Sequence, residues 1–167
     1  MDFSLPPDLD ALRLRVRAFV HDHAIPLEAD PANFDAHENI RLDRLETLRA
    51  HAKQAGLWAP QAPVAWGGMG LSIVGRAAFY EEANYGLFGP VAMNCAAPDD
   101  GNMSILARVG TEAQKQRWLK PIVDGEVRSS FAMLCAQTKA IFVHLVRGLC
   151  INRRRKHRGD LLKAKID

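Results

Sequence analysis

The sequence has no long hydrophobic run and no recognisable targeting segment. No apolar stretch approaches the roughly 20 residues that a membrane-spanning helix needs, so we expect no membrane association. The N-terminus has an acidic second residue and lacks the apolar core of a secretory signal. It also lacks the Ser- and Arg-rich, acid-poor composition of a transit peptide. These absences argue against a secreted, imported or membrane-embedded protein.

Cysteine is scarce as well. Cys95, Cys135 and Cys150 are odd in number, widely spaced and form no CxxC pair. That pattern argues against a disulfide framework and against a structural zinc site, so we expect no metal. A reducing, cytoplasmic location is the simplest prediction.

The composition is that of a globular protein, with 48% apolar and 25% charged residues. A length of 167 residues allows one domain with a substantial core. The net charge of +3 conceals a break along the chain. Residues 1–134 hold 13 Lys+Arg against 17 Asp+Glu, whereas residues 135–167 hold 9 against 2. A mildly acidic body is therefore followed by a strongly basic tail, as if the two had different origins.

Helical periodicity dominates the body. The first helix starts at Pro6–Pro7 and its pattern ends at Pro26. A second helix is predicted over 41–55, where Gly56 suits the left-handed residue that follows a helix. A third segment, 71–85, is apolar around most of its circumference, as in a helix buried between neighbours. The apolar stripe of the first helix consists of Leu5, Leu9, Leu12, Val16, Phe19 and Val20.

Two more helices precede a strand. One is predicted to end at Val109 and to be broken or shifted at Pro98. The other begins at Thr111, which forms a capping box with Gln114. Residues 127–134 then resemble a β-strand. The fold class is therefore mainly α, with the start of a β-domain and an irregular basic tail.

Three stretches of the body resemble the acyl-CoA dehydrogenase family. GMGLSIVGRAAFYEEANYG (68–86) resembles the glycine turn and third helix of that family. VGTEAQKQRWLKPIVDGEVRSSFAM (109–133) resembles its signature, GTEEQKxxWLxPLxxGE followed by FAMTEP. NCAAPDDGNM (94–103) is similar to a subgroup that, in animals, is fused to a kinase-like domain. The resemblance covers residues 5–133, the first four-fifths of the chain.

The resemblance implies an antiparallel helical bundle of the acyl-CoA dehydrogenase N-terminal type over 1–126. Residues 127–134 would be the first strand of a middle β-domain, and 135–167 a divergent tail. It also implies FAD as the cofactor and an acyl-CoA thioester as the substrate, oxidised at adjacent carbons as in fatty acid β-oxidation. The family's catalytic base is a carboxylate of the C-terminal domain, and no residue here matches it.

The sequence departs from the family directly after Met133. The family continues with Thr-Glu-Pro and a turn that holds the flavin ring, whereas this chain reads LCAQT. The tail segment INRRRKH is only faintly similar to the family's INGRKxW strand. We hypothesise a frameshift, a splicing remnant or a degenerate gene, and hence a truncated, catalytically incomplete enzyme that is inactive alone. The alternative is a non-enzymatic helical module that associates with a full-length dehydrogenase or with copies of itself.

The resemblance assigns two groups of site residues and no catalytic residue. Phe131, Ala132 and Met133 match positions that run along the flavin ring; the alternative is an ordinary half-buried strand. A second group lies where the family's acyl chain approaches the helical domain; the alternative is that its members cap helices and form turns. This predicted substrate-pocket group consists of Asn94, Cys95 and Asp99.

Three other patterns have simpler structural interpretations. The Gly67–Gly70 segment matches no nucleotide-binding motif, and a tight turn is favoured over a phosphate cradle. Glu81 and Glu82 diverge on a helix, so a structural ion pair is favoured over an acid/base pair. His21 and His23 also diverge on a helix, and we expect them to be exposed to solvent rather than to chelate a metal. The basic run 153–158 raises the possibility of nucleic-acid binding, but no aromatic side chain follows Phe142, so nucleic acid is a disfavoured partner.

Overall fold

The computed structural model describes residues 4–130 together with the strand residues 152–153, and its architecture is mainly helical. The predicted fold class is therefore confirmed. No helix in this part of the chain is long and apolar enough to cross a membrane. Two short 3₁₀ turns, η2 (Pro31–Asn33) and η3 (Val64–Trp66), lie in the connections between helices.

The first helix does not end at Pro26. Helix α1 (Pro7–Phe19) runs through a π-helical turn, η1 (Val20–Ala24), directly into α2 (Ile25–Glu28). The Ile25 N–H donates to the Val20 carbonyl, five residues back, and this wide turn comes immediately before Pro26. Because proline lacks an N–H and its ring collides with a carbonyl four residues earlier, a wider turn lets the helix continue.

The same arrangement recurs near the end of the domain. Helix α7 (Glu112–Gln114) begins with the predicted capping box, which is confirmed. It continues as the π-helical turn η4 (Lys115–Leu119) and then as α8 (Lys120–Asp124), whose second residue is Pro121. The Lys120 N–H donates to the Lys115 carbonyl, again five residues back.

Three of the remaining helices lie close to their predicted positions: α3 (Leu42–Gln54), α4 (Ile73–Ala83) and α6 (Asp99–Val109). The short helix α5 (Gly89–Ala92) was not predicted as a separate element. Gly56 follows α3 with φ +68°, as expected for a left-handed residue after a helix. Pro98 immediately precedes α6, so the predicted break is confirmed. The expectation of a helix buried between neighbours holds for the later turns of α4 but not for its first turn, where Ile73 is 77% and Val74 54% exposed.

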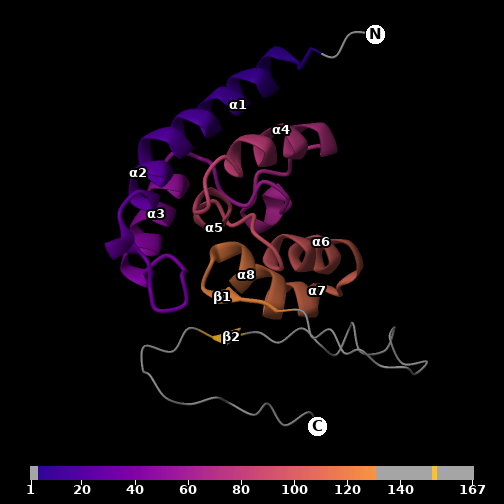
Figure 1. Cartoon of the computed structure of the whole chain (residues 1–167). Coiled ribbons are helices and arrows are strands. Elements are labelled where there is room, and N and C mark those ends of the chain that lie inside the picture. The colour runs from indigo at the N-terminus through magenta and orange to yellow at the C-terminus, as the bar shows by residue number, and fades with distance from the viewer. Residues whose placement is uncertain (1–3, 131–151, 154–167) are drawn as a thin grey trace, which may run out of the picture.

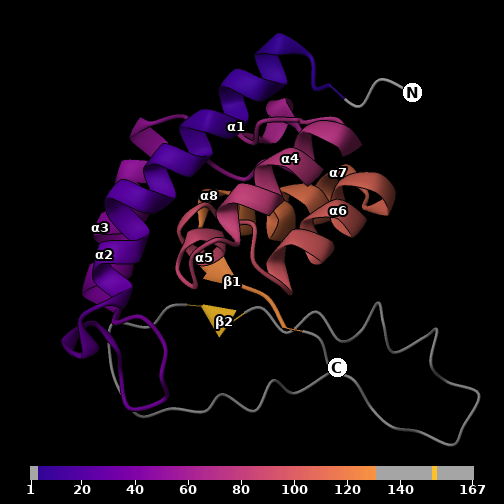
Figure 2. The same ribbon diagram turned by 45° about the horizontal axis from the view of Figure 1, so that its top comes forward.

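The helices surround one core, in which α5 is central (Figure 1). Helix α1 lies alongside α4, and α3 packs on α5. Figure 1 shows α6, α7 and α8 on the far side of α4 from α1, and α6 and α7 lie there in Figure 2 as well. The largest fully buried apolar side chains come from α3, α4, α6, η4 and α8 and from the segments that follow α3 and α5: Leu48, Leu57, Phe79, Met93, Met103, Leu119 and Ile122.

A short strand, β1 (Val127–Arg128), follows α8 and lies within the predicted range 127–134. It pairs antiparallel with β2 (Asn152–Arg153), so that Val127 is opposite Arg153 and Arg128 is opposite Asn152. Residues 131–134 of the predicted strand, and most of the basic tail, lie outside the described residues.

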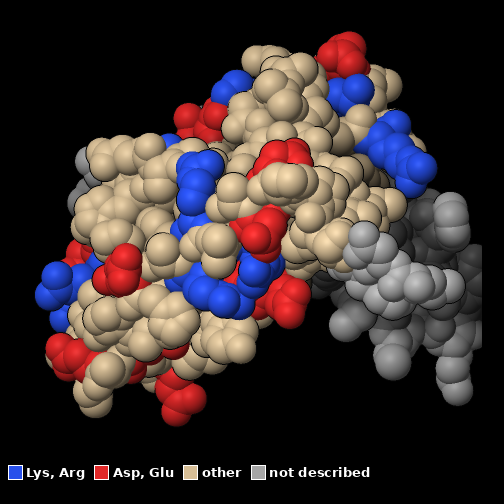
Figure 3. All heavy atoms as spheres, turned by 90° about the horizontal axis from the view of Figure 1, so that it is seen from above, with Lys and Arg blue, Asp and Glu red and all other residues tan. Residues whose placement is uncertain are grey.

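Charged side chains are mixed on the face seen in Figure 3. Lys and Arg alternate there with Asp and Glu, separated by uncharged surface. This part of the described surface therefore forms no broad basic patch of the kind that binds a phosphate backbone.

Candidate functional site

The strand that leads toward residues 131–133 is fastened to the start of α6 by Asp99. The Asp99 side chain is buried, with 3% of its surface exposed. One carboxylate oxygen accepts hydrogen bonds from the Ser129 N–H and hydroxyl, both at 2.6 Å. The other accepts from Arg128 Nε at 3.0 Å. Charge-assisted hydrogen bonds of this kind are stronger than neutral ones, so the contact holds β1 firmly.

Asn102 extends this contact by one helical turn. Its side-chain amide donates to Ser129 Oγ at 2.8 Å, while that hydroxyl donates to Asp99. Asn102 is 1% exposed and Ser129 is 7% exposed, so the three side chains form a buried network. We call the group Asp99, Asn102, Arg128 and Ser129 the strand latch. It ends two residues before Phe131, and the predicted cofactor-contacting residues Phe131, Ala132 and Met133 themselves lie outside the described residues.

Asn94 has a different set of partners. It adopts a left-handed backbone conformation with φ +56° and is 4% exposed. Its side-chain amide donates to the carbonyls of Ile122 and Val123, at 3.0 and 3.2 Å. These carbonyls belong to the last turn of α8, where helix carbonyls lack intrahelical partners. Asn94 therefore caps α8 from the loop after α5.

Cys95 is also buried, with 6% of its surface exposed. Burial, assisted by the nearby negative charge of Asp100, raises the pKa of its thiol to about 12. The thiol thus stays protonated near neutral pH and is a poor nucleophile, because the thiolate is the reactive form. This agrees with the expectation that Cys95 behaves as a small buried apolar residue.

Gln61 was missed by the sequence analysis. Its side chain donates to the Asn94 backbone carbonyl at 3.0 Å and accepts from the Tyr80 hydroxyl at 3.2 Å. Burial raises the pKa of Tyr80, so its hydroxyl remains a donor at physiological pH. The signal available in the sequence was weak: a lone amide in an otherwise apolar segment, between Pro60 and Pro63.

The three predicted substrate-pocket residues therefore lie in two different environments. Asn94 contacts Gln61 and the end of α8, and Cys95 lies near Tyr80, whereas Asp99 contacts β1. Each of them is almost completely buried within the helical domain. Their side chains thus make their contacts inside the helical domain.

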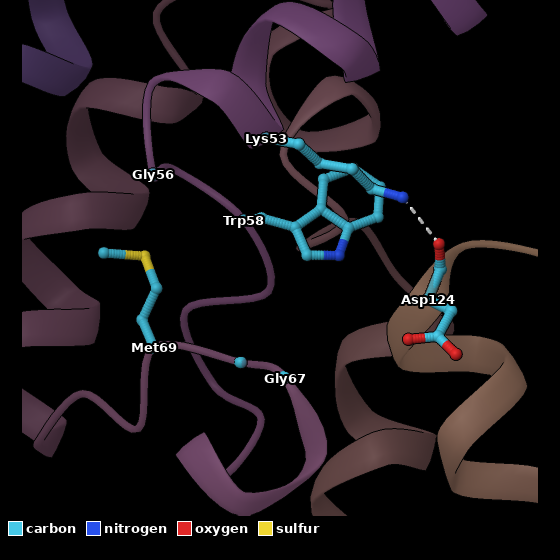
Figure 4. A pocket seen from close by; sticks show the side chains of 7 residues that line it. Lys53, Gly56, Trp58, Gly67, Met69 and Asp124 are labelled. Atoms are coloured by element: carbon cyan, nitrogen blue, oxygen red, sulfur yellow. Dashed lines mark hydrogen bonds between the residues drawn. The ribbon is translucent and has the colours of Figure 1, made fainter.

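A separate hollow of about 430 Å³ opens between the end of α3, the glycine loop (residues 67–70) and the end of α8. Figure 4 shows Lys53 extending across the Trp58 indole toward the main-chain oxygen of Asp124. The Lys53 ammonium lies 4.3 Å from the ring centroid and donates to that oxygen at 2.7 Å, while Trp58 Nε1 donates to the Val123 carbonyl at 2.7 Å. These contacts fasten α8 to α3. No predicted site residue is among those that line the hollow, which are Lys53, Gly56, Trp58, Gly67, Gly68, Met69 and Asp124.

The glycine loop forms a tight turn and not a phosphate cradle. Gly67 and Gly70 have φ of +97° and +62°. The backbone N–H groups of residues 67–70 all donate to carbonyls of the preceding loop, so they are not available to an anion. A Cβ on Gly68 would lie 2.2 Å from the Ala62 carbonyl oxygen, which explains the glycine there. The prediction of a turn is confirmed.

Glu82 forms the predicted structural ion pair. It is 1% exposed and accepts hydrogen bonds from Arg13 at 2.9 Å and from Arg17 at 2.7 and 2.8 Å. These contacts join α4 to α1, and Glu81 points elsewhere and is exposed. His21 and His23 are exposed as expected. Among the residues that the structure describes, no group of three or more His, Cys, Asp or Glu side chains is placed to hold a metal ion.

Comparison with known proteins identifies the helical domain. Residues 6–126 match the model of the acyl-CoA dehydrogenase N-terminal domain. Acyl-CoA dehydrogenase family member 11 of Rattus norvegicus is 37% identical over 125 residues, which cover 71% of this chain and 16% of the relative. FadE2 of Mycobacterium tuberculosis, named as an acyl-CoA dehydrogenase, is 36% identical over 143 residues, covering 80% of this chain and 33% of the relative.

A solved structure has the same fold. It carries the assignment of an acyl-CoA dehydrogenase from Mycobacterium abscessus and superposes with a TM-score of 0.67 at 32% sequence identity. The superposition covers 83% of this chain and 37% of that one. The chain thus spans between one sixth and little more than one third of the length of these relatives.

Proposed function

This chain belongs to the acyl-CoA dehydrogenase family. We propose that residues 4–130 form the helical domain of an enzyme that uses FAD to oxidise acyl-CoA thioesters. In this reaction a proton and a hydride leave adjacent carbons of the acyl chain and a 2-enoyl-CoA remains. The flavin supplies the hydride chemistry when it is bound, and the protein positions substrate and cofactor. The proton acceptor would be a carboxylate of the family's C-terminal domain, and no residue of this chain is assigned that role.

The strand latch is the observation that carries the proposal. Residues 131–133 are the ones that the family resemblance places along the flavin ring, and the latch fixes the backbone that enters them. Asp99 binds both Arg128 and Ser129, so the direction and register of β1 depend on α6. A rigid element is the support that a cofactor-contacting segment requires, since small displacements cost binding and rate.

The predicted site residues keep distinct roles in this proposal. Phe131, Ala132 and Met133 would contact the isoalloxazine ring. The wall of the acyl pocket would be supported from within the helical domain by Asn94, Cys95 and Asp99. Their burial supports a part in shaping that wall.

We further propose that residues 1–167 are catalytically incomplete on their own. Support comes from the departure from the family's sequence directly after Met133. The test is to purify the chain, measure its flavin absorbance, and assay dye reduction with a saturated acyl-CoA. Turnover of acyl-CoA by the purified chain would refute incompleteness, whereas bound flavin without turnover would support both parts of the proposal.

The exposed start of α4 favours a second candidate function, that of a module that binds a complete dehydrogenase subunit or a second copy of itself. Ile73 and Val74 are largely exposed there, and Val64, at 71%, is exposed in the preceding loop. Exposed apolar side chains that gather in one region mark interaction surfaces. A colourless protein that co-purifies with a dehydrogenase would favour this candidate over an FAD-binding one.

A further inference from the structure

Two exposed histidines from different helices face one another on the surface of the domain. His23 lies in the π-helical turn η1 and His51 lies in the last turn of α3. Their ring centroids are 5.4 Å apart and the rings are inclined by 55°. The sequence gives no indication of this pair, because the obvious neighbour of His23, His21, diverges from it and lies 6.3 Å from the Tyr85 ring instead.

The spacing of the two rings suits a shared metal ion. Zinc binds imidazole nitrogen at about 2.0–2.1 Å, so two imidazoles on one tetrahedral ion have ring centroids about 5 Å apart. Imidazole is a ligand that Zn²⁺, Cu²⁺ and Ni²⁺ favour, whereas Mg²⁺ prefers oxygen. Both side chains are exposed, so an ion can reach them and water can fill its remaining positions.

The position of His23 is also restrained. Its ring packs at 5.1 Å from Phe19, which is buried one turn earlier in α1. His51 is held by α3, whose neighbouring residues Leu48 and Ala52 are buried. Because each of the two helical segments is anchored in the core, the ligand pair needs little rearrangement on binding, which reduces the entropic cost of forming the site.

We propose that His23 and His51 form a two-histidine site for a late first-row divalent transition metal, Zn²⁺, Ni²⁺ or Cu²⁺. Bound metal links the π-helical turn after α1 to the end of α3. An ion that binds the folded chain and not the unfolded one raises the unfolding temperature, and the rise grows with the logarithm of its concentration relative to its Kd. The proposal is independent of FAD and of acyl-CoA.

The experiment is thermal unfolding of the full chain at neutral pH with ZnCl₂, NiCl₂ or MgCl₂, accompanied by calorimetric titration of Ni²⁺. We expect Zn²⁺ and Ni²⁺, but not Mg²⁺, to raise the unfolding temperature by a few degrees. His23→Gln and His51→Gln should each remove this rise and weaken Ni²⁺ binding at least tenfold. His21→Gln and His37→Gln are matched controls that should respond as the unchanged chain does.

The two variants lie on different helices and replace exposed rings, and their unfolding without metal shows whether each is folded. An unchanged chain that does not respond to Zn²⁺ or Ni²⁺ would overturn the proposal, because the rings would then be packed without binding an ion. A His23→Gln or His51→Gln variant that keeps the full response would also overturn it, by placing the metal at other histidines.

Discussion

At the scale of single residues, two adjacent glutamates show how position on a helix separates exposure from burial. Glu81 and Glu82 are neighbours in α4, yet Glu81 is exposed and Glu82 is 1% exposed. Successive residues on a helix point about 100° apart, so only one of them faces α1. A buried carboxylate requires charged partners, and Arg13 and Arg17 provide them.

We expect Glu82→Gln to destabilise the domain by about 2 kcal/mol, and Glu81→Gln by less than about 0.5 kcal/mol. Removal of one partner of a buried ion pair often costs more, but Arg13 and Arg17 are 24% and 45% exposed and can turn to water. Urea unfolding of both variants measures the difference. Equal losses in the two variants would contradict the role assigned to Glu82.

The same ion pair predicts a pH dependence. Hydrogen bonds from Arg17 and Arg13 lower the pKa of Glu82 below its ordinary value of 4.5. A group whose folded pKa is depressed stabilises the fold above its unfolded pKa, and this contribution is lost as pH falls through the folded pKa. Between pH 5 and acid unfolding, the unchanged chain should therefore lose more stability than Glu82→Gln. Parallel urea titrations with identical pH slopes would contradict this prediction.

Two left-handed glycines provide a matched pair for backbone strain. Gly56 and Gly125 have φ of +68° and +77° and follow α3 and α8. A Cβ on Gly125 would lie 2.8 Å from the Trp58 ring, whereas a Cβ on Gly56 would lie 3.7 Å from its nearest neighbour, the Arg15 guanidinium. We expect Gly56→Ala to cost about 1 kcal/mol and Gly125→Ala about 3 kcal/mol, since overpacking adds to the conformational strain. Denaturant unfolding monitored by tryptophan fluorescence measures both costs.

At the scale of elements, local signals predicted most helix ends. The Thr111–Gln114 capping box, Gly56 and Pro98 each act within a few residues of the end that they define, so the sequence reveals them directly. Pro26 misled the prediction because a π-helical turn before it keeps the helix continuous, and the same kind of turn precedes Pro121. Packing of the continued helix against the core can stabilise such a turn, and the local sequence pattern does not reveal this packing.

The strand latch gives a prediction at this scale. Asp99→Asn replaces one acceptor oxygen by an amide donor that faces Ser129 and Arg128. We expect this substitution to lower the free energy of unfolding by about 2–3 kcal/mol. Hydrogen exchange should accelerate at the amides of residues 127–129. Asp100→Asn is the adjacent control, because Asp100 accepts from the N–H of the following Gly101 and not from β1. Unchanged protection of 127–129 in Asp99→Asn would show that β1 is held by other contacts.

At the scale of the whole molecule, the resemblance of three sequence stretches predicted the fold, and the helical arrangement and the family match confirm it. The contacts of the candidate site were not predictable in the same way. Gln61 reaches Asn94 and Tyr80, and Asp99 reaches Ser129, across separations of 19 to 33 residues. Such pairs form only when α4, α6 and α8 pack together, so periodicity and caps contain no information about them.

The central claim is that this helical domain can serve an acyl-CoA dehydrogenase. It is tested most directly by a chimera in which residues 1–130 replace the matching segment of FadE2, the relative that is 36% identical over 143 residues. The measurement is flavin reduction by a saturated acyl-CoA, with intact FadE2 and FadE2 lacking the segment as references. We predict that the chimera retains flavin and is reduced at a rate within about tenfold of intact FadE2, a difference of about 1.4 kcal/mol in barrier. A folded chimera that binds flavin but is reduced no faster than FadE2 without the segment would contradict the account.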